Sequence, residues 1–506
     1  MEIGTFARSG LLAMTIPVSV EEIGKECFAY CHSLVSLTFE ENSRLRYVGD
    51  GAFIETHLLH AHFPDAVVLG LCVFKKSSVE EIRIGGVQPS LISGIYAGTD
   101  VPRTLKVSQD LESLKDSCFE CCRLLTSVDF ETPSRLTRIG KSAFSESGLR
   151  VLVIPSSVVE LEESCFAHAT SLISVTFETP SRLAKIGASA FLETPLPTFV
   201  IPASVKELGI KCLANCPSLA SVIFEAGSRL TGIGASAFVG SGLLAMTIPA
   251  CVEWLGASCL GCCLSLASIA FEAGSRLTRI EASAFLRSGL QAITIPKDVE
   301  ELGEWCLADG RSLRSITFEA GSRLSRIRGY AFLRSNLQSI GIPASVESLG
   351  LKCLADCYAL ASVIFEDGSR LTAIEEGVFS GSALQSLVVP ASVAQLKKEC
   401  FLFCQSLFSV TFEDDSHLRE IGAGAFFKSG LQSITIPASV EKFGERCFAL
   451  CSSLANIYLK DPSQLREIEP EVFYGSLRTQ IVLPDGRRFL ASQLNRGWTL
   501  GSPFPA

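Results

Sequence analysis

Proline recurs in this sequence at a fixed interval of 47 residues, and in the main series it directly follows an aliphatic residue each time. A period in this range is typical of chains built from stacked repeats rather than from independent globular domains. The interval therefore constrains the fold more than any other feature. The prolines of the main series are Pro155, Pro202, Pro249, Pro296, Pro343, Pro390, Pro437 and Pro484, and an earlier pair is Pro17 and Pro64.

Each 47-residue unit contains the frame L-x-x-L-x-L twice, at a spacing of 23 or 24 residues, as in Leu219–Phe224 and Leu243–Ile248. The last apolar positions of the frame alternate with polar ones, as a short strand with one buried face requires. One such coil cannot bury that face alone, but coils stacked in parallel form a continuous apolar core. We count about 21 placements between Leu11 and Leu483 and predict a solenoid of about 21 coils.

The segments between the frames predict how each coil closes. The proline cannot donate to a strand ladder, so it should end the strand and turn the chain. The A-S-A-F segment Ala235–Phe238 is compatible with one helical or 3₁₀ turn. The predicted fold is a leucine-rich-repeat solenoid with a parallel β-ladder on one face. Its other face should carry short loops and single helical or 3₁₀ turns.

The quality of the repeat divides the chain into four segments. Residues 1–64 and 108–484 follow the repeat, whereas residues 65–107 fit it poorly and read as a degenerate leucine-rich repeat. Residues 485–506 contain no further frame and should form a C-terminal cap or tail.

Composition excludes several classes of partner. Lys and Arg number 44 against 53 Asp and Glu, a formal net charge of −9, so the chain has no basic footprint for nucleic acid. No run of about 18 apolar residues is present, so we expect no membrane insertion. The stretch SGLLAMTIP at Ser9–Pro17 resembles a signal-peptide core, but it recurs at Ser241–Pro249 and is therefore read as part of the repeat.

The 20 cysteines mostly occupy one repeated slot. Equivalent slots hold Ala237 and Ser241, which indicates a demand for small, half-buried side chains. Disulfides and a zinc site remain alternatives, but neither the 47-residue spacing nor the missing C-x₂-C and His ligands favours them. We expect reduced core thiols and no cofactor. The C-x-x-x-C pairs are Cys27/Cys31, Cys118/Cys122, Cys212/Cys216, Cys259/Cys263, Cys353/Cys357, Cys400/Cys404 and Cys447/Cys451.

His60 and His62 share one face of a strand frame and should point together out of the core. Two imidazoles could hold a metal ion, but no third ligand is evident in the sequence. We prefer a solvated histidine pair and keep the metal site as the weaker alternative.

Charged residues also form columns at the 47-residue period. Neighbouring Glu and Arg columns should offset one another at a solvated edge. The alternative is an arginine ladder that grips an anionic polymer. The columns are Glu178, Glu225, Glu272, Glu319, Glu366 and Glu413, and Arg182, Arg229, Arg276, Arg323 and Arg370.

The outward strand positions are mostly small and uncharged, as at Thr294, Thr317 and Thr435. Such a face lacks the Trp, Tyr and Arg anchors that usually carry binding energy. It reads either as a neutral scaffold face or as a broad, weak contact surface for a protein or glycan.

No nucleophile elbow or glycine-rich phosphate loop occurs in the sequence. Its carboxylates recur as ladders, whereas a catalytic pair needs residues in distinct environments. We therefore expect a non-enzymatic protein without catalytic residues.

Frames such as Leu431–Pro437 and Ile421–Phe426 resemble the BspA-like leucine-rich repeats. The resemblance covers nearly the whole chain and implies a surface or secreted protein of the kind found in host-associated bacteria and parasitic protists. It also implies adhesion to a protein or glycan ligand along an extended face. Because we read no signal peptide or anchor in the sequence, an intracellular scaffold in the cytoplasm is the alternative. The ligand and the oligomeric state stay open.

Overall fold

The computed structural model describes residues 1–64, 67–70, 72–79, 81–84, 104–107, 109–476, 478–494 and 498–499. Most of the predicted degenerate segment 65–107 and the end of the predicted cap 485–506 therefore lie outside the described residues. The chain divides into two compact units, Met1–Leu243 and Leu244–Ala506.

Within the described residues of the first unit, long and short strands alternate along the chain at nearly every coil. Long strands pair in parallel in the groups β1–β3, β5–β7, β8–β10–β12–β14 and β16–β18. The long strands are β1 (Ala13–Ile16), β3 (Ser36–Phe39), β5 (His60–Phe63), β7 (Glu81–Ile84), β8 (Thr104–Val107), β10 (Ser127–Phe130), β12 (Val151–Ile154), β14 (Ser174–Phe177), β16 (Thr198–Ile201) and β18 (Ser221–Phe224). The short strands are β2 (Glu22–Ile23), β4 (Tyr47–Val48), β6 (Val68–Leu69), β9 (Ser113–Leu114), β11 (Arg138–Ile139), β13 (Glu160–Leu161), β15 (Lys185–Ile186), β17 (Glu207–Leu208) and β19 (Gly232–Ile233).

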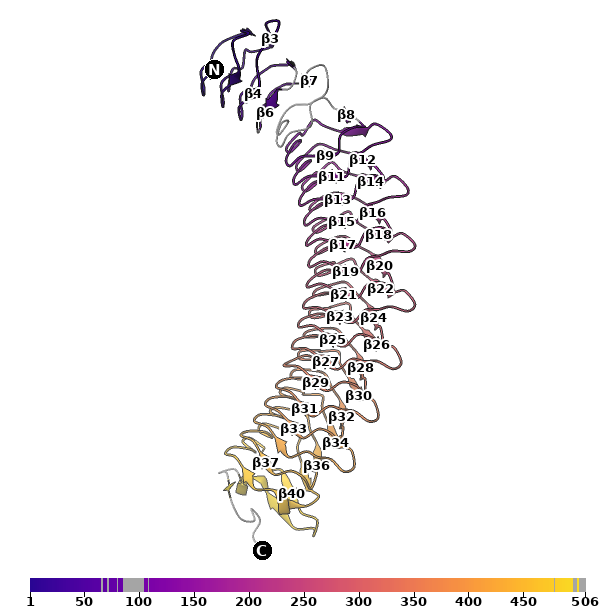
Figure 1. Ribbon diagram of the computed structural model, residues 1–506. Coiled ribbons are helices and arrows are strands. Elements are labelled where there is room, and N and C mark those ends of the chain that lie inside the picture. The colour runs from indigo at the N-terminus through magenta and orange to yellow at the C-terminus, as the bar shows by residue number, and fades with distance from the viewer. Residues whose placement is uncertain are drawn as a thin grey trace. The chain divides into compact units, whose positions relative to one another are not determined.

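The second unit repeats this plan, with its short strands along one side of the coils and its long strands along the other (Figure 1). The long strands are β20 (Ala245–Ile248), β22 (Ser268–Phe271), β24 (Ala292–Ile295), β26 (Ser315–Phe318), β28 (Ser339–Ile342), β30 (Ser362–Phe365), β32 (Ser386–Val389), β34 (Ser409–Phe412), β36 (Ser433–Ile436), β38 (Asn456–Leu459) and β40 (Gln480–Val482). The short strands are β21 (Trp254–Leu255), β23 (Arg279–Ile280), β25 (Glu301–Leu302), β27 (Arg326–Ile327), β29 (Ser348–Leu349), β31 (Ala373–Ile374), β33 (Gln395–Leu396), β35 (Glu420–Ile421), β37 (Lys442–Phe443) and β39 (Glu467–Ile468).

The second unit ends in a different arrangement. Strand β41 (Arg488–Leu490) pairs antiparallel with β40, and β42 (Trp498–Thr499) pairs antiparallel with β39. Two 3₁₀ helices lie nearby in sequence, η1 (Pro462–Gln464) and η2 (Ala491–Leu494). These two antiparallel pairs contrast with the parallel pairing of the coils before them, and the cap or tail at residues 485–506 stays a prediction.

The strand pattern follows the alternation in the sequence. In β24, Ile293 and Ile295 are buried, whereas Ala292 and Thr294 face outward. The strand ends at Ile295 because Pro296 has no N–H to donate to the ladder. The predicted parallel solenoid is thus confirmed, and its roughly 19 turns come close to the predicted 21.

The third side of each coil differs from the predicted helical or 3₁₀ turn. In the coil of Lys211, alternate N–H groups donate to the next coil, from Lys211 to Ala235 O (3.0 Å) and from Leu213 to Ala237 O (2.8 Å). The intervening N–H of Cys212 closes a local i→i−3 turn on Gly209 O. Lys211 and Asn215 adopt left-handed backbone, with φ of 56° and 52°. We call this side the turn face: it is a hydrogen-bonded ladder of its own, and the backbone alternation replaces a helix.

Phenylalanines and cysteines fill the core behind the turn face. In the first unit, Phe144 and Phe166 stack with ring centroids 5.4 Å apart and an interplanar angle of 2°. The thiol of Cys216 donates to Phe191 O of the preceding coil (3.2 Å) and lies 3.5 Å from the hydroxyl of Thr194. Every member of the C-x-x-x-C pairs is buried, so the prediction of core thiols is confirmed. The slot therefore suits a small side chain with a weak donor, which Cys provides.

Candidate binding surfaces

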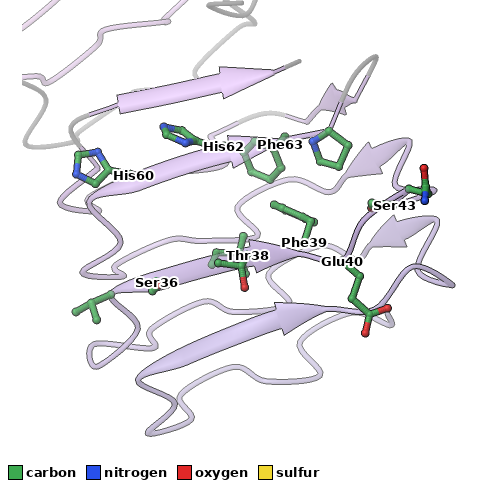
Figure 2. A pocket seen from close by; sticks show the side chains of 12 residues that line it. Ser36, Thr38, Phe39, Glu40, Ser43, His60, His62 and Phe63 are labelled. Atoms are coloured by element: carbon green, nitrogen blue, oxygen red, sulfur yellow. The ribbon is translucent and has the colours of Figure 1, made fainter. Parts of the chain in front are cut away.

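The long-strand face of the first unit is hollowed into an open groove of about 740 Å³ at β3 and β5. Figure 2 shows His60 and His62 on β5 and Ser36 and Thr38 on the neighbouring strand, all along the outer face. The lining also includes Glu40 at the end of β3. We call this hollow the strand-face groove.

His60 and His62 point outward from β5, as the alternation predicts, with ring centroids 6.2 Å apart. Within the described part of the chain, no group of three or more His, Cys, Asp or Glu side chains could hold a metal ion. The two imidazoles thus lie near each other among the side chains that line the groove.

Three exposed apolar side chains occupy successive coils at the edge of the same face. Their exposed fractions are 68% for Leu12, 50% for Val35 and 41% for Leu59. Val35 also lines the groove, and its N–H donates to Leu12 O (2.9 Å). The repeat frame does not predict this column. Its signal in the sequence is the apolar residue directly after the first Leu of three consecutive frames.

The predicted threonines do lie outward on the long-strand face of the second unit. Thr294 and Thr317 are paired in register on β24 and β26, and their hydroxyl oxygens lie 2.8 Å apart. Thr435 on β36 stands opposite Tyr458 on β38, whose side chain is 42% exposed. Hydroxyls that bond to one another make a polar but uncharged surface.

The glutamate column has a structural role that the repeat pattern alone does not reveal. The carboxylate of Glu225 accepts a hydrogen bond from the backbone N–H of Ala203 in the preceding coil (3.0 Å). This N–H follows the proline, where strand pairing has stopped, so the carboxylate satisfies a donor that the ladder leaves open. The same bond recurs at Glu40, Glu131, Glu178, Glu272, Glu319, Glu366 and Glu413.

The arginine column is exposed. Arg323 lies 3.6 Å from Asp298. Arg229, Arg276 and Arg370 form no ion pair within the residues that the structure describes. The expected offset with the glutamate four residues earlier is therefore not seen as direct pairing. The glutamate column accepts hydrogen bonds from backbone N–H groups, whereas the arginine column faces solvent.

Burial makes the core thiols poor nucleophiles. Desolvation raises the pKa of Cys306 to about 12 and that of Cys404 to about 12. A thiol in this state stays protonated at neutral pH, and the thiolate is the reactive form. In the described chain, no helix is both apolar enough and long enough to cross a bilayer.

The coils carry two parallel strand ladders joined by short connectors, and their leucines pack into a continuous core. This architecture defines a leucine-rich-repeat solenoid. The sequence pattern of the BspA type leucine rich repeat region matches six times, at residues 1–88, 90–220, 184–314, 231–361, 278–407 and 372–495. The chain belongs to this family. Solenoids of this class are protein-binding scaffolds.

Three of the solved structures that are similar to this chain are leucine-rich repeat proteins. A leucine-rich repeat protein from Bacteroides ovatus is 25% identical, with 75% of this chain and 86% of that chain covered and a TM-score of 0.48. One from Eubacterium ventriosum is 21% identical (70% and 83% covered, TM-score 0.39). A leucine rich cell surface protein from Faecalibacterium prausnitzii is 20% identical (89% and 88% covered, TM-score 0.31). None of the curated proteins compared with this chain matches it.

Proposed function

We propose that this protein is a non-enzymatic adhesion module that binds a protein ligand along its long-strand face, at a cell surface. One observation carries the proposal. The face presents uncharged side chains on successive coils and is hollowed at the strand-face groove, where polar and apolar side chains meet. Membership of the BspA-type family supports the surface role.

The chemistry of the groove favours a protein ligand over a glycan. Leu12, Val35 and Leu59 form an apolar edge that can desolvate a side chain of the ligand. Ser36, Thr38, His60 and His62 supply hydrogen-bonding groups beside it. Farther along the chain, hydroxyl pairs such as Thr294 and Thr317 add weak contacts, so affinity comes from many coils at once.

A second candidate is an intracellular scaffold that binds protein partners through the same face. None of the 20 cysteines, all of them in the described part of the chain, forms a disulfide, a state that a reducing compartment maintains. Protease treatment of intact cells separates the two candidates. Loss of the full-length protein supports the surface module, and protection until lysis supports the scaffold.

Binding by the full chain to immobilised extracellular matrix proteins and to a glycan array tests the ligand class. We expect a protein ligand, and we expect Thr38→Arg with His62→Glu to weaken its binding by about tenfold or more, because both changes put charge into the groove. Arg276→Ala on the exposed edge is the matched control and should bind normally. Unchanged binding by the groove variant, or binding to glycans alone, would contradict the proposal.

A further inference from the structure

The turn face carries two open pockets that are copies of one another. The first unit contains a pocket of about 540 Å³ lined by Arg123, Glu146, His168 and Thr170, which we call the acidic pocket. The second unit contains one of about 510 Å³ lined by Leu264, Arg287, Asp309 and Arg311, which we call the arginine pocket. Each residue of the arginine pocket lies three 47-residue periods after its counterpart.

The backbone of the two pockets is the same. The φ values of Glu146 and His168 are 53° and 57°, and those of Arg287 and Asp309 are 56° and 52°. The N–H of Glu146 donates to Ala167 O (2.9 Å), and the N–H of Arg287 donates to Ala308 O (3.0 Å). The backbone of the coils therefore forms this pocket with either set of lining side chains.

The charges of the two pockets are reversed. In the acidic pocket, Glu146 pairs with Arg123 at 3.2 Å, and His168 lies 3.1 Å from Glu193 of the next coil. At the positions equivalent to Glu146 and Glu193, the arginine pocket holds Arg287 and Arg334. Because the coils close equally well with either sign, the charge of the arginine pocket is not a requirement of the fold.

The arginine pocket contains three guanidinium groups, and only two of them lie near a carboxylate of the chain. Arg287 lies 3.6 Å from Asp309, and Arg334 lies 3.7 Å from Asp356. Arg311 stands at the position of Thr170, is exposed, and makes no ion pair with any described residue. Three guanidinium groups in one pocket favour a ligand with carboxylates, which guanidinium groups bind through paired hydrogen bonds.

An aromatic pair lies on the turn face beside the arginine pocket. Trp305 and Tyr330 are half-buried and stacked, with ring centroids 4.4 Å apart and an interplanar angle of 15°. They pack on Ala308 and Leu333, the residues directly before Asp309 and Arg334 in the chain. In the first unit the equivalent positions hold Ser164 and Ser189, so the fold does not need rings there. Trp, Tyr and Arg together are the residues that most often carry binding energy.

We propose that the arginine pocket, with Trp305 and Tyr330, is a docking site for an acidic, extended segment of a protein partner. Arg287 and Arg334 lie two coils apart, about 10 Å at the spacing of parallel strands. One turn of polyproline II, an extended conformation with three residues per turn and a rise of about 3.1 Å per residue, spans about the same distance and keeps the side chains of residues i and i+3 on one side. The segment therefore carries carboxylates at positions i and i+3, and an apolar side chain of the segment rests on the aromatic pair. This site goes beyond the strand-face groove and lies on a different side of the coil.

The two pockets allow an exchange experiment, in which charged residues of the acidic pocket are placed at the equivalent positions of the arginine pocket. Arg287→Glu, Asp309→His and Arg334→Glu together recreate the column Glu146, His168 and Glu193 on a backbone that already accepts those residues. The probe is a fluorescein-labelled peptide with Glu at every third position and one Leu, titrated with the full chain. We expect binding that the exchange variant weakens by at least about tenfold, and that Arg311→Ala and the double variant Trp305→Ser, Tyr330→Ser each weaken several-fold.

Three controls establish that the peptide binds through its charge and at this pocket. The same peptide with Gln in place of Glu should not bind, and salt should weaken the Glu peptide. The groove variant Thr38→Arg, His62→Glu should bind it normally, so failure at one site leaves the other standing. Thermal unfolding confirms that the variants fold. No binding of the Glu peptide, equal binding by wild type and exchange variant, or displacement only by heparin, a sulfated polysaccharide, would overturn the proposal.

Discussion

Two stretches of the second unit fill the same core slot in different ways. From Phe379 to Phe473 every coil places a phenylalanine there, with successive ring centroids 5.1–5.9 Å apart. From Leu260 to Leu354 the coils alternate between leucine and phenylalanine. We call these the stacked region and the alternating region. Both bury the slot almost completely and both keep the parallel ladders.

The difference shows what the solenoid requires. The slot needs an apolar side chain of sufficient volume, and stacking of rings is one way to supply it. In the alternating region the stacked aromatic pair lies instead on the surface, at Trp305 and Tyr330. Leu307 and Phe332 fill the slot of these coils, so the core does not need Trp305 and Tyr330. This supports the assignment of the two rings to partner binding.

Alkaline pH gives the largest expected effect and should affect both regions alike. Burial raises the pKa of Cys404 in the stacked region to about 12 and that of Cys357 in the alternating region to about 11, from an ordinary value of 9.0. The folded chain therefore keeps protons that the unfolded chain loses, and stability is complete below pH 9 and falls above it. Each thiol lowers the free energy of unfolding by up to about 1.4 kcal/mol per pH unit in that window.

Urea unfolding between pH 8 and pH 11 measures this loss. Cys404→Ser and Cys357→Ser should each reduce it, because a hydroxyl keeps the small donor without the titration. An unfolding free energy that is flat over this range would show that the thiols titrate freely in the folded chain.

Truncation of the stacked core is the next largest effect. Phe426→Ala should cost about 3–5 kcal/mol, since it leaves a cavity between two rings. Phe426→Leu makes the stacked region resemble the alternating one and should cost less than about 1.5 kcal/mol. Chemical denaturation of both variants compares them. If Phe426→Leu lowers the unfolding free energy as much as Phe426→Ala does, stacking between rings stabilises this region. The stacked and alternating regions would then depend on different interactions.

Much of this fold could be predicted because the repeat pattern specifies which side chains are buried. The frame around Thr294 specifies inward and outward positions, and Pro296 specifies where the strand ends. The turn face could not be predicted. Lys211 and Trp305 take left-handed backbone without being glycine, held by hydrogen bonds to neighbouring coils. Such bonds depend on register between coils, which the sequence of one coil does not contain.

The candidate surfaces divide in the same way. The outward direction of His60 and Thr317 follows from strand alternation and could be predicted. The groove and the arginine pocket could not, because each is formed by side chains from different coils. Glu225 shows the same difficulty: its sequence neighbour is Arg229, whereas its partner is the N–H of Ala203.

The glutamate column should contribute equally in the two regions, since it acts on the backbone and not on the core slot. Glu413 accepts from Ala391 N–H at 2.9 Å in the stacked region, and Glu319 accepts from Lys297 N–H at 3.0 Å in the alternating region. Either change to Ala should cost roughly 1 kcal/mol in urea unfolding. Change to Gln keeps an acceptor and should cost less. A clear inequality between the two sites would mean that the core slot alters how the connector is held.

The smallest expected effect comes from ion pairs on the short-strand side of each region. Hydrogen bonds from Arg328 hold the pKa of Glu301 below its usual range in the alternating region, with Arg328 Nε 2.7 Å from Glu301 Oε1. Lys442 does the same to the pKa of Glu469 in the stacked region, at 2.6 Å.

A lowered carboxyl pKa stabilises the folded state above the ordinary pKa, and this contribution disappears as pH falls through the folded value. At pH 7, Arg328→Ala and Lys442→Ala should each reduce the unfolding free energy by about 0.2–1 kcal/mol. At pH 3 both differences should shrink, because protonated carboxyls no longer attract the lost cations. Differences that persist at pH 3 would mean that these long side chains stabilise the coils by packing and not by charge.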